Sequence, residues 1–209
     1  GMLLYIYSPT QILMYIVLAA AVFATAFSLT WMFAVPPEVM EADAPKGAKK
    51  AEPAPVSAPF PEELGSVAKG VFVPMEELPD QTFAQGVLGT CCGVTPEEGR
   101  VYAPMDGTVS QLAETCHAVG IEAEGVELLI HVGVDTVEMK GDGFKSHVRE
   151  GQAVKKGGLL LTVDLEKVKA AGHPSTIVVV VTNSEDLASV EAAASGAVRP
   201  GAPLMKLKA

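Results

Sequence analysis

Residues 126–139 read VELLIHVGVDTVEM, a run of branched apolar residues interrupted by one histidine and then by Gly and Asp. Such runs favour β-strands. Similar runs recur through the C-terminal two thirds of the chain, separated by Gly, Pro, Asp and Asn: VYAPMDGTV (101–109), GLLLTVDL (158–165), STIVVVVTN (175–183) and PLMKLK (203–208). Short runs at close spacing predict an all-β, antiparallel sandwich or barrel. Only residues 164–171 and 184–194 are predicted to be helical, and both segments are short.

The N-terminal part has a different composition. Residues 12–35, ILMYIVLAAAVFATAFSLTWMFAV, carry no charge, and a helix of this length crosses a hydrocarbon core of about 30 Å. We therefore expect a transmembrane helix within residues 1–37. Lys46, Lys49 and Lys50 follow it, so the positive-inside rule places the following domain in the cytoplasm, at the inner face of the membrane. A cleaved signal peptide is the alternative, but basic residues normally precede its apolar core and none precede this one.

Residues 38–70 are rich in Pro, Ala, Glu and Lys and poor in large apolar side chains. Such a composition cannot bury a core, and it predicts a disordered linker. The sequence thus divides into a membrane segment (1–37), a tether (38–70) and a folded domain (71–209).

The net charge of −10 argues against nucleic acid as a partner, because phosphate backbones are bound by clusters of Lys and Arg. A basic or neutral protein partner fits this charge better. The three cysteines, Cys91, Cys92 and Cys116, form neither an even disulfide framework nor a paired metal motif. We interpret them as reduced thiols.

Two histidines lie in or beside apolar runs: His117 in ETCHAVGI and His131 in ELLIHVGVD. Fourteen residues separate them, which suits two antiparallel strands joined by a turn around residues 122–125 and would bring the rings face to face. A histidine pair of this kind suits phosphoryl transfer or metal binding. The alternative for either residue is an ordinary core or surface side chain.

Six segments in order resemble the glucose-type IIA domain of the bacterial phosphoenolpyruvate-dependent sugar phosphotransferase system. The resemblance implies that His131 is the phosphorylated histidine, that His117 is the second histidine facing it, that Thr115 is the hydroxyl residue near the second ring, and that Asp135 is the acidic residue of the HxGxDTV motif. Asp135 could equally be a turn residue that ends the strand. The segments are PMEELPDQTFAQGVLG (74–89), VYAPMDGTV (101–109), ETCHAVGI (114–121), GVELLIHVGVDTVEMKGDGF (125–144), GQAVKKGGLLLTVDLEKVKAAG (151–172) and VVVVTN (178–183).

The resemblance implies a fold of the duplicated hybrid motif type and a relay function. The phosphoryl donor would be the carrier protein HPr and the acceptor a cysteine of a IIB domain, so sugar uptake would be coupled to sugar phosphorylation.

The apolar N-terminal run resembles the last helix of the IIC part of a fused permease. The chain departs from the family beside the second histidine, where Cys116 replaces a small or amide residue. Both partners would dock on an apolar face around the histidines, with candidate contributors Phe83, Leu88, Val119, Leu129 and Val137.

Three rival hypotheses use the same residues. HVGVD also resembles the HxGxD zinc ligands of lysostaphin-like metallopeptidases, but those enzymes need an H-x-H pair that this chain lacks. Residues 138–140, EMK, are similar to the modified lysine motif of biotinyl and lipoyl carriers, although its order relative to VREGQAVKKGGLLL is reversed. A non-catalytic regulatory IIA-like domain would bind other proteins instead.

The transfer itself requires no cofactor. A zinc ion shared with a partner could still bind His117 and His131, with the partner completing the zinc coordination, since two ligands leave a zinc shell incomplete.

Overall fold

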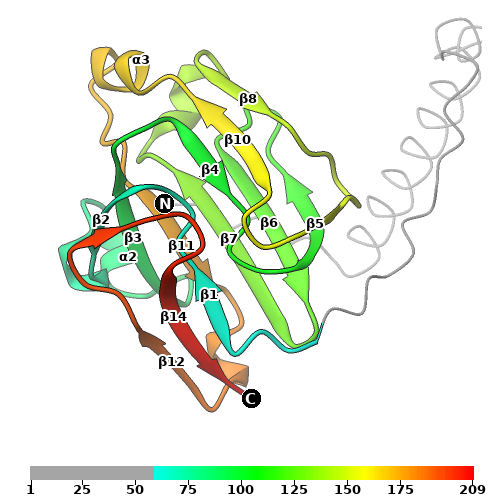
Figure 1. The fold of residues 1–209 in the computed structure, drawn as a ribbon. Helices are drawn as coiled ribbons and strands as arrows, with labels where there is room; N and C mark the ends of the chain where they lie inside the picture. The colour runs from blue at the N-terminus through cyan, green and yellow to red at the C-terminus, as the bar shows by residue number, and fades with distance from the viewer. Residues whose placement is uncertain (1–58) are drawn as a thin grey trace, which may run out of the picture. The chain divides into compact units, whose positions relative to one another are not determined.

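The computed structural model describes residues 59–209, and it consists mainly of antiparallel β-strands with a few short helices (Figure 1). The largest sheet has eight strands in the order β13-β2-β3-β11-β7-β6-β5-β9, and every neighbouring pair in it is antiparallel. The predicted all-β, antiparallel architecture is therefore confirmed. These strands are β2 (Gly70–Val73), β3 (Thr90–Pro96), β5 (Gly107–Leu112), β6 (Ala118–Ala123), β7 (Val126–Val132), β9 (Ala153–Val154), β11 (Ile177–Val181) and β13 (Ala197–Val198).

Two three-stranded sheets complete the fold. One has the order β1-β14-β12 and the other has the order β4-β10-β8. Both are antiparallel, and β1 brings the beginning of the domain beside its C-terminal strand. The strands are β1 (Glu63–Gly65), β4 (Arg100–Tyr102), β8 (Phe144–Ser146), β10 (Leu159–Val163), β12 (Ser189–Ala192) and β14 (Pro203–Lys208).

Strand β11 is the most buried element of the large sheet. All five of its residues, IVVVV, are buried, and it pairs with β3 on one side and β7 on the other. Its side chains alternate between two apolar clusters: Val179 belongs to the larger and Val178 to the smaller. The neighbouring strand β3 alternates in the same way, so Cys92 lies in the larger cluster and Cys91 in the smaller. The large sheet therefore buries apolar side chains on both faces here.

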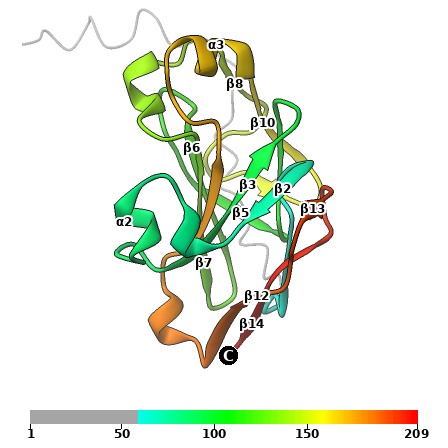
Figure 2. The ribbon, with the colours of Figure 1, turned by 90° about the vertical axis from the view of Figure 1, so that its left-hand side faces the viewer.

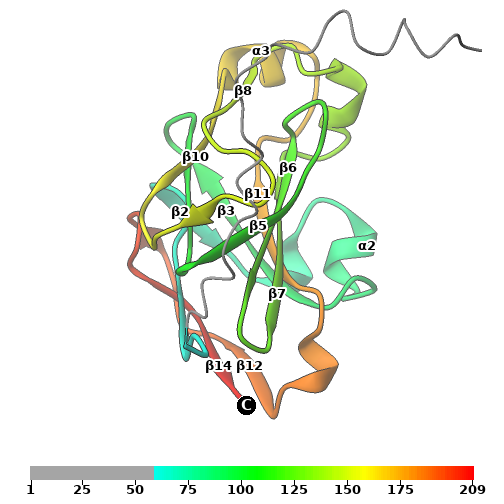
Figure 3. The ribbon, with the colours of Figure 1, turned by 90° about the vertical axis from the view of Figure 1, so that its right-hand side faces the viewer.

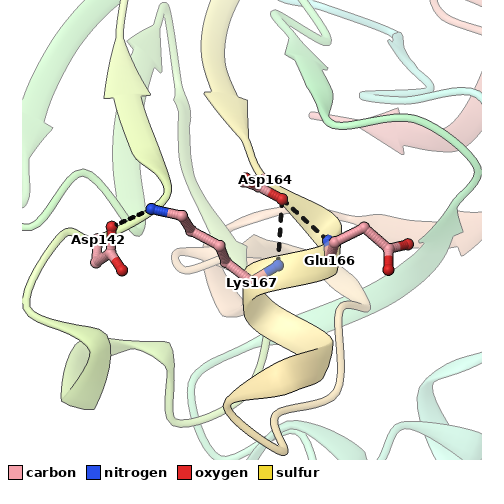
Figure 4. A network of polar contacts seen from close by, with 4 residues as sticks. All are labelled: Asp142, Asp164, Glu166 and Lys167. Carbon is pink, nitrogen blue, oxygen red and sulfur yellow. Dashed lines mark hydrogen bonds and ion pairs between the residues drawn. The ribbon is translucent and has the colours of Figure 1, made fainter.

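The helices are short and each begins at an aspartate. Helix α2 (Gln81–Ala84) is capped by Asp80, and helix α3 (Leu165–Ala170) is capped by Asp164 (Figure 4). Three 3₁₀ turns add to them: η2 (Met75–Glu77), η3 (Thr136–Met139) and η4 (Ser184–Asp186). Helix α2 and the turn that follows β7 stand on the same side of the large sheet in two opposite views (Figures 2 and 3).

The predicted helix over residues 164–171 is confirmed, but the one over 184–194 is wrong. In the second segment η4 covers only three residues, and β12 pairs with β14 from Ser189 to Ala192. Val190 also packs against the main core. Tertiary pairing thus overrides the helical preference of a Glu- and Ala-rich segment.

The folded part begins before residue 71, where the sequence analysis ended the linker. Strand β1 lies ahead of that boundary, and Leu64, Val67 and Ala68 are fully buried in the main core. The predicted membrane helix over residues 12–35 and most of the predicted linker lie outside the described residues. Within residues 59–209, no helix has the length and apolar character needed to cross a membrane.

Candidate functional site

The hairpin of β6 and β7 brings the two predicted histidines together. Ala118 pairs with His131, and the N–H of Val132 donates to the carbonyl of His117 at 2.8 Å. Glu124 and Gly125 form the turn, with Gly125 at φ +73°. The two rings consequently lie 5.0 Å apart between centroids, in an edge-to-face arrangement with 78° between their planes. The fourteen-residue spacing therefore predicted correctly that the two rings meet, but the expected face-to-face arrangement is wrong, because the rings meet edge to face.

A backbone carbonyl fixes the tautomer of His131. Its Nδ1 lies 2.7 Å from the carbonyl oxygen of Gly133. Because a carbonyl only accepts, Nδ1 carries the proton and donates it, which leaves the lone pair of the neutral ring on Nε2. His131 therefore has Nε2 free for a nucleophilic role.

A hydroxyl group holds the other ring. Thr115 Oγ1 lies 2.5 Å from His117 Nδ1. When the hydroxyl donates to Nδ1, the neutral ring carries its proton on Nε2 and can donate there. The loop between β5 and β6 supports this contact through Cys116, which adopts φ +55° and donates its backbone N–H to the carbonyl of Ala113. The structure thus brings Thr115, His117 and His131 together.

The environment favours the neutral form of both rings. Burial lowers the pKa of His131, while the Gly133 carbonyl and the charges of Asp135 and Asp80 act in the opposite direction. Burial also lowers the pKa of His117, and the neighbouring His131 adds to this effect. Neutral imidazoles are the forms that attack phosphorus or donate a single hydrogen bond.

Asp135 has the features of both alternatives that the sequence left open. It adopts a left-handed conformation, φ +57°, at the start of η3, as a turn residue does, and its side chain caps no backbone N–H there. Its exposed carboxylate nevertheless acts on His131 through its charge. Asp135 therefore ends the strand and also contributes to the electrostatics of the site.

The short helix α2 adds two residues that sequence reasoning did not assign to the catalytic group. The ring of Phe83 lies 5.5 Å from that of His131 at 54°, and it is only 7% exposed. Asp80 caps this helix by accepting from the N–H groups of Thr82 and Phe83. The aspartate in DQTF was the available signal, because Asp is a preferred N-cap residue.

The predicted docking residues divide into core and surface. Val119 and Phe83 are buried and Leu129 is partly buried, whereas Leu88 is 43% exposed and Val137 is 52% exposed. Val87, which the sequence analysis did not select, is 67% exposed. Leu88, Val87 and Leu129 border the same open pocket, of about 770 Å³. Leu129 and His131 are two residues apart on β7 and therefore lie on the same face of the sheet, so this pocket opens on the face that carries His131.

His147, Cys91 and Cys92 take no part in the contact between His117 and His131, although Cys91 Sγ donates to the carbonyl of Phe83 at 3.2 Å. His147 directly follows β8 and contacts Oγ1 of Thr162, on β10, at 3.2 Å. Burial raises the pKa of Cys91 to about 11 and that of Cys92 to about 12. Both therefore remain protonated thiols at neutral pH, in agreement with their interpretation as reduced cysteines.

Comparison with known proteins agrees with this geometry. The family profile described as "phosphoenolpyruvate-dependent sugar phosphotransferase system, EIIA 1" matches residues 62–187. The beta-glucoside-specific EIIBCA component of Dickeya chrysanthemi is 45% identical over 189 residues, covering 88% of this chain and 30% of that protein. The glucose-specific EIIA component of Halalkalibacterium halodurans is 42% identical over 146 residues, covering 69% of this chain and 84% of that protein.

A solved structure shows the same fold. The glucose permease IIA from Mycoplasma capricolum superposes with a TM-score of 0.63 at 30% identity, covering 68% of this chain and 93% of that one. The chain spans less than a third of the length of the fused EIIBCA relative.

Proposed function

Because this chain belongs to the EIIA 1 family of the sugar phosphotransferase system and is a phosphoryl-transfer component of that system, we propose that His131 is the residue that carries the phosphoryl group. The observation that supports this assignment is the bond from His131 Nδ1 to the Gly133 carbonyl, which leaves Nε2 as the nucleophile.

In the proposed step, the Nε2 lone pair of His131 attacks the phosphorus of a phosphohistidine on the donor. The new N–P bond forms as the donor's N–P bond breaks. The electron pair of that bond returns to the donor ring, which carries a proton on its other nitrogen and so leaves as a neutral imidazole. The proton on His131 Nδ1 stays in place, and its bond to Gly133 stabilises the positive charge that the phosphorylated ring acquires. No proton needs to leave His131.

His117 stabilises the transferred group in this proposal. With Thr115 donating to its Nδ1, the Nε2–H of His117 is available as a donor to a phosphoryl oxygen. Phosphoryl transfer depends mainly on positioning and on hydrogen bonds to the equatorial oxygens, where the charge is spread. The close approach of the two rings supports such a role.

HPr is the proposed donor, and the cysteine of a IIB domain is the proposed acceptor. The exposed side chains of Val87, Leu88 and Val137 support a docking face beside the histidines. Two partners that use one histidine must dock there in turn.

The two three-stranded sheets that accompany the eight-stranded sheet support the finer proposal of a closed sandwich of the duplicated hybrid motif type.

We further propose that the domain is tethered to the inner face of the cell membrane through residues 1–37, as the last part of a fused permease. The uncharged run over residues 12–35 supports the tether. The match to the fused EIIBCA relative supports the permease, because it covers 88% of the chain and so reaches beyond the described residues.

The histidine pair also supports the proposal of a zinc ion shared with a partner. Structural zinc takes four ligands, and residues 59–209 contain no group of three or more His, Cys, Asp or Glu side chains that could hold a metal. His117 and His131 would supply two imidazole ligands, and a partner's carboxylate would have to contribute as well. The phosphoryl transfer proposed above uses no metal.

Phosphorylation of the purified chain by phosphoenolpyruvate, enzyme I and HPr tests the assignment. We expect an acid-labile phosphoryl group on the wild type and none on His131→Ala. His117→Ala should still be labelled but should pass the group to a IIB domain at least tenfold more slowly, since a lost transition-state donor typically costs about a hundredfold or more. His147→Ala and His173→Ala are the controls and should behave as the wild type. Labelling that survives His131→Ala would contradict the assignment.

A further inference from the structure

The loop that follows β7 contains a fully buried polar side chain that the phosphoryl transfer does not use directly. Thr136 is 0% exposed, and its hydroxyl donates to the carbonyl of Val132 at 2.6 Å. Among the other polar residues of 59–209, only Ser66, at 0% exposed, and Thr176, at 8%, are buried. A buried hydroxyl in an apolar core is costly unless it makes a specific bond, so its position here requires an explanation.

The methyl group of Thr136 packs against the glycine whose carbonyl orients His131. Gly133 adopts φ +79°, and a Cβ there would lie 2.3 Å from Thr136 Cγ2 and 3.0 Å from the carbonyl oxygen of Pro174. Thr136 therefore touches the peptide of Gly133 from one side, while its hydroxyl holds the preceding carbonyl. The single side chain contacts both residues that flank the 132–133 peptide bond.

The opposite side of the loop is held by backbone bonds. The N–H of Gly133 donates to the carbonyl of Thr176, and that of Val134 donates to the carbonyl of Pro174, both at 3.0 Å. These bonds extend the pairing of β7 with β11 beyond its last strand residue. The Gly133 peptide is thus held between Thr136 and two residues that precede β11, Pro174 and Thr176.

We propose that Thr136 is a positioning residue for phosphoryl transfer, which fixes the Gly133 carbonyl and through it the Nδ1–H tautomer of His131. This inference rests on the proposed role of His131. The two tautomers of a neutral imidazole differ little in free energy, so the hydrogen bond to Nδ1 decides which one is populated. A displaced carbonyl would allow the other tautomer, in which Nε2 carries the proton and cannot attack phosphorus.

Three variants at Thr136 distinguish the effect of its hydroxyl group from the effect of its methyl group. Thr136→Val keeps the shape but removes the donor and leaves the buried Val132 carbonyl without it. We expect ¹⁵N spectra of labelled histidine to show a mixture of His131 tautomers, and phosphorylation by phospho-HPr to slow about threefold to tenfold, as the loss of one hydrogen bond implies. Thr136→Ser keeps the hydroxyl and should retain the wild-type tautomer with a rate within about twofold. Thr136→Cys, with its weak S–H donor, should lie between them.

Ser66→Ala is the matched control. The hydroxyl of Ser66 is equally buried and donates to the carbonyl of Ala68 at 2.8 Å, in the segment between β1 and β2. Its removal should lower the urea midpoint as Thr136→Val does, without changing the histidine spectrum or the transfer rate. A general loss of stability is thereby distinguished from a loss of positioning.

A folded Thr136→Val protein with the wild-type tautomer and rate would overturn the proposal. If Thr136→Val does not fold, a wild-type spectrum and rate for Thr136→Cys would overturn it instead. The tautomer is observed without any phosphoryl transfer, so this test remains valid if His131→Ala shows that another residue carries the phosphoryl group.

Discussion

At the scale of single residues, opposing effects act on the pKa of His131. Its burial favours the neutral ring, whereas the carboxylates of Asp135 and Asp80 and the Gly133 carbonyl favour the protonated one. Burial has the larger effect, so the neutral ring predominates above the ordinary histidine pKa of about 6.5 and persists somewhat below it. The relay is thus suited to neutral pH.

Asp135→Asn should lower the pKa of His131 further, because it removes a negative charge that favours the protonated ring. Asn also tolerates the left-handed backbone at this position, so the turn should persist. The pH below which phosphorylation is lost should move downward, as measured by initial rates and by NMR titration of His131. Asp142→Asn, which changes an aspartate without a resolved effect on His131, should leave the titration unchanged. An unchanged or raised pKa in Asp135→Asn would contradict the prediction.

The same depression of the pKa affects stability. In the unfolded chain His131 protonates near pH 6.5, whereas in the folded domain its pKa is lower. The contribution of His131 to the free energy of unfolding is therefore fully present above pH 6.5. It is lost as the pH falls through the lower pKa of the folded state.

The histidine pair could be predicted from the sequence because a hairpin is local, but other parts of the site could not. Asp80 lies fifty-one residues from His131 in the chain, and the two approach each other only because β3 and β7 both pair with β11. The role of Thr136 depends on a packing contact with Gly133 that no spacing rule indicates. Non-local contacts of this kind require the fold.

At the scale of elements, the short helices depend on their caps. Helices α2 and α3 contain four and six residues, too few to be stable alone.

The start of α3 could be predicted from the sequence, because Asp164 is a preferred N-cap residue. Strand β12 could not be predicted, because its partner β14 lies later in the chain. The ion pair between Lys167 and Asp142 also joins α3 to the loop after η3, but both groups are exposed and the pair contributes little (Figure 4).

Removal of each cap should have a comparable effect on stability but a different effect on the site. Asp164→Ala and Asp80→Ala each leave two helical N–H groups without an acceptor, and each should lower the free energy of unfolding by about 1 kcal/mol in urea titrations. Only Asp80→Ala should also lower the pKa of His131 and slow phosphorylation, since α2 holds Phe83 against that ring. Equal transfer rates in the two variants would show that α2 does not support the site.

At the scale of the whole molecule, the domain combines a buried core with a few exposed apolar side chains, which we propose as the docking face. The core surrounds β11, whose residues are completely buried on both faces of the large sheet. The proposed docking residues Val87, Leu88 and Val137 are exposed. The net charge of −10 is an unfavourable charge for binding a phosphate backbone, as the sequence analysis expects.

This separation predicts two distinct classes of variant. Ile177→Ala, in the core, should lower the free energy of unfolding by about 2–5 kcal/mol, because it leaves a cavity at a fully buried position. Val87→Ser should change stability by less than about 0.5 kcal/mol, since the side chain is exposed. It should nevertheless weaken the binding of HPr, measured as chemical-shift changes on titration. Unchanged HPr affinity for Val87→Ser and for Leu88→Ser would place the docking face elsewhere.

The register of the β6–β7 hairpin, in which Ala118 lies opposite His131, also constrains how the gene for this domain can change. Side chains alternate between the two faces of a strand, so one codon gained or lost between Val126 and His131 would turn the histidine toward the opposite face. Point substitutions along the hairpin leave this alternation intact. Homologues of this domain should therefore differ in the amino acids of these two strands but keep the strand lengths. An insertion of one residue in these strands should be found only together with a deletion of one residue that restores the register.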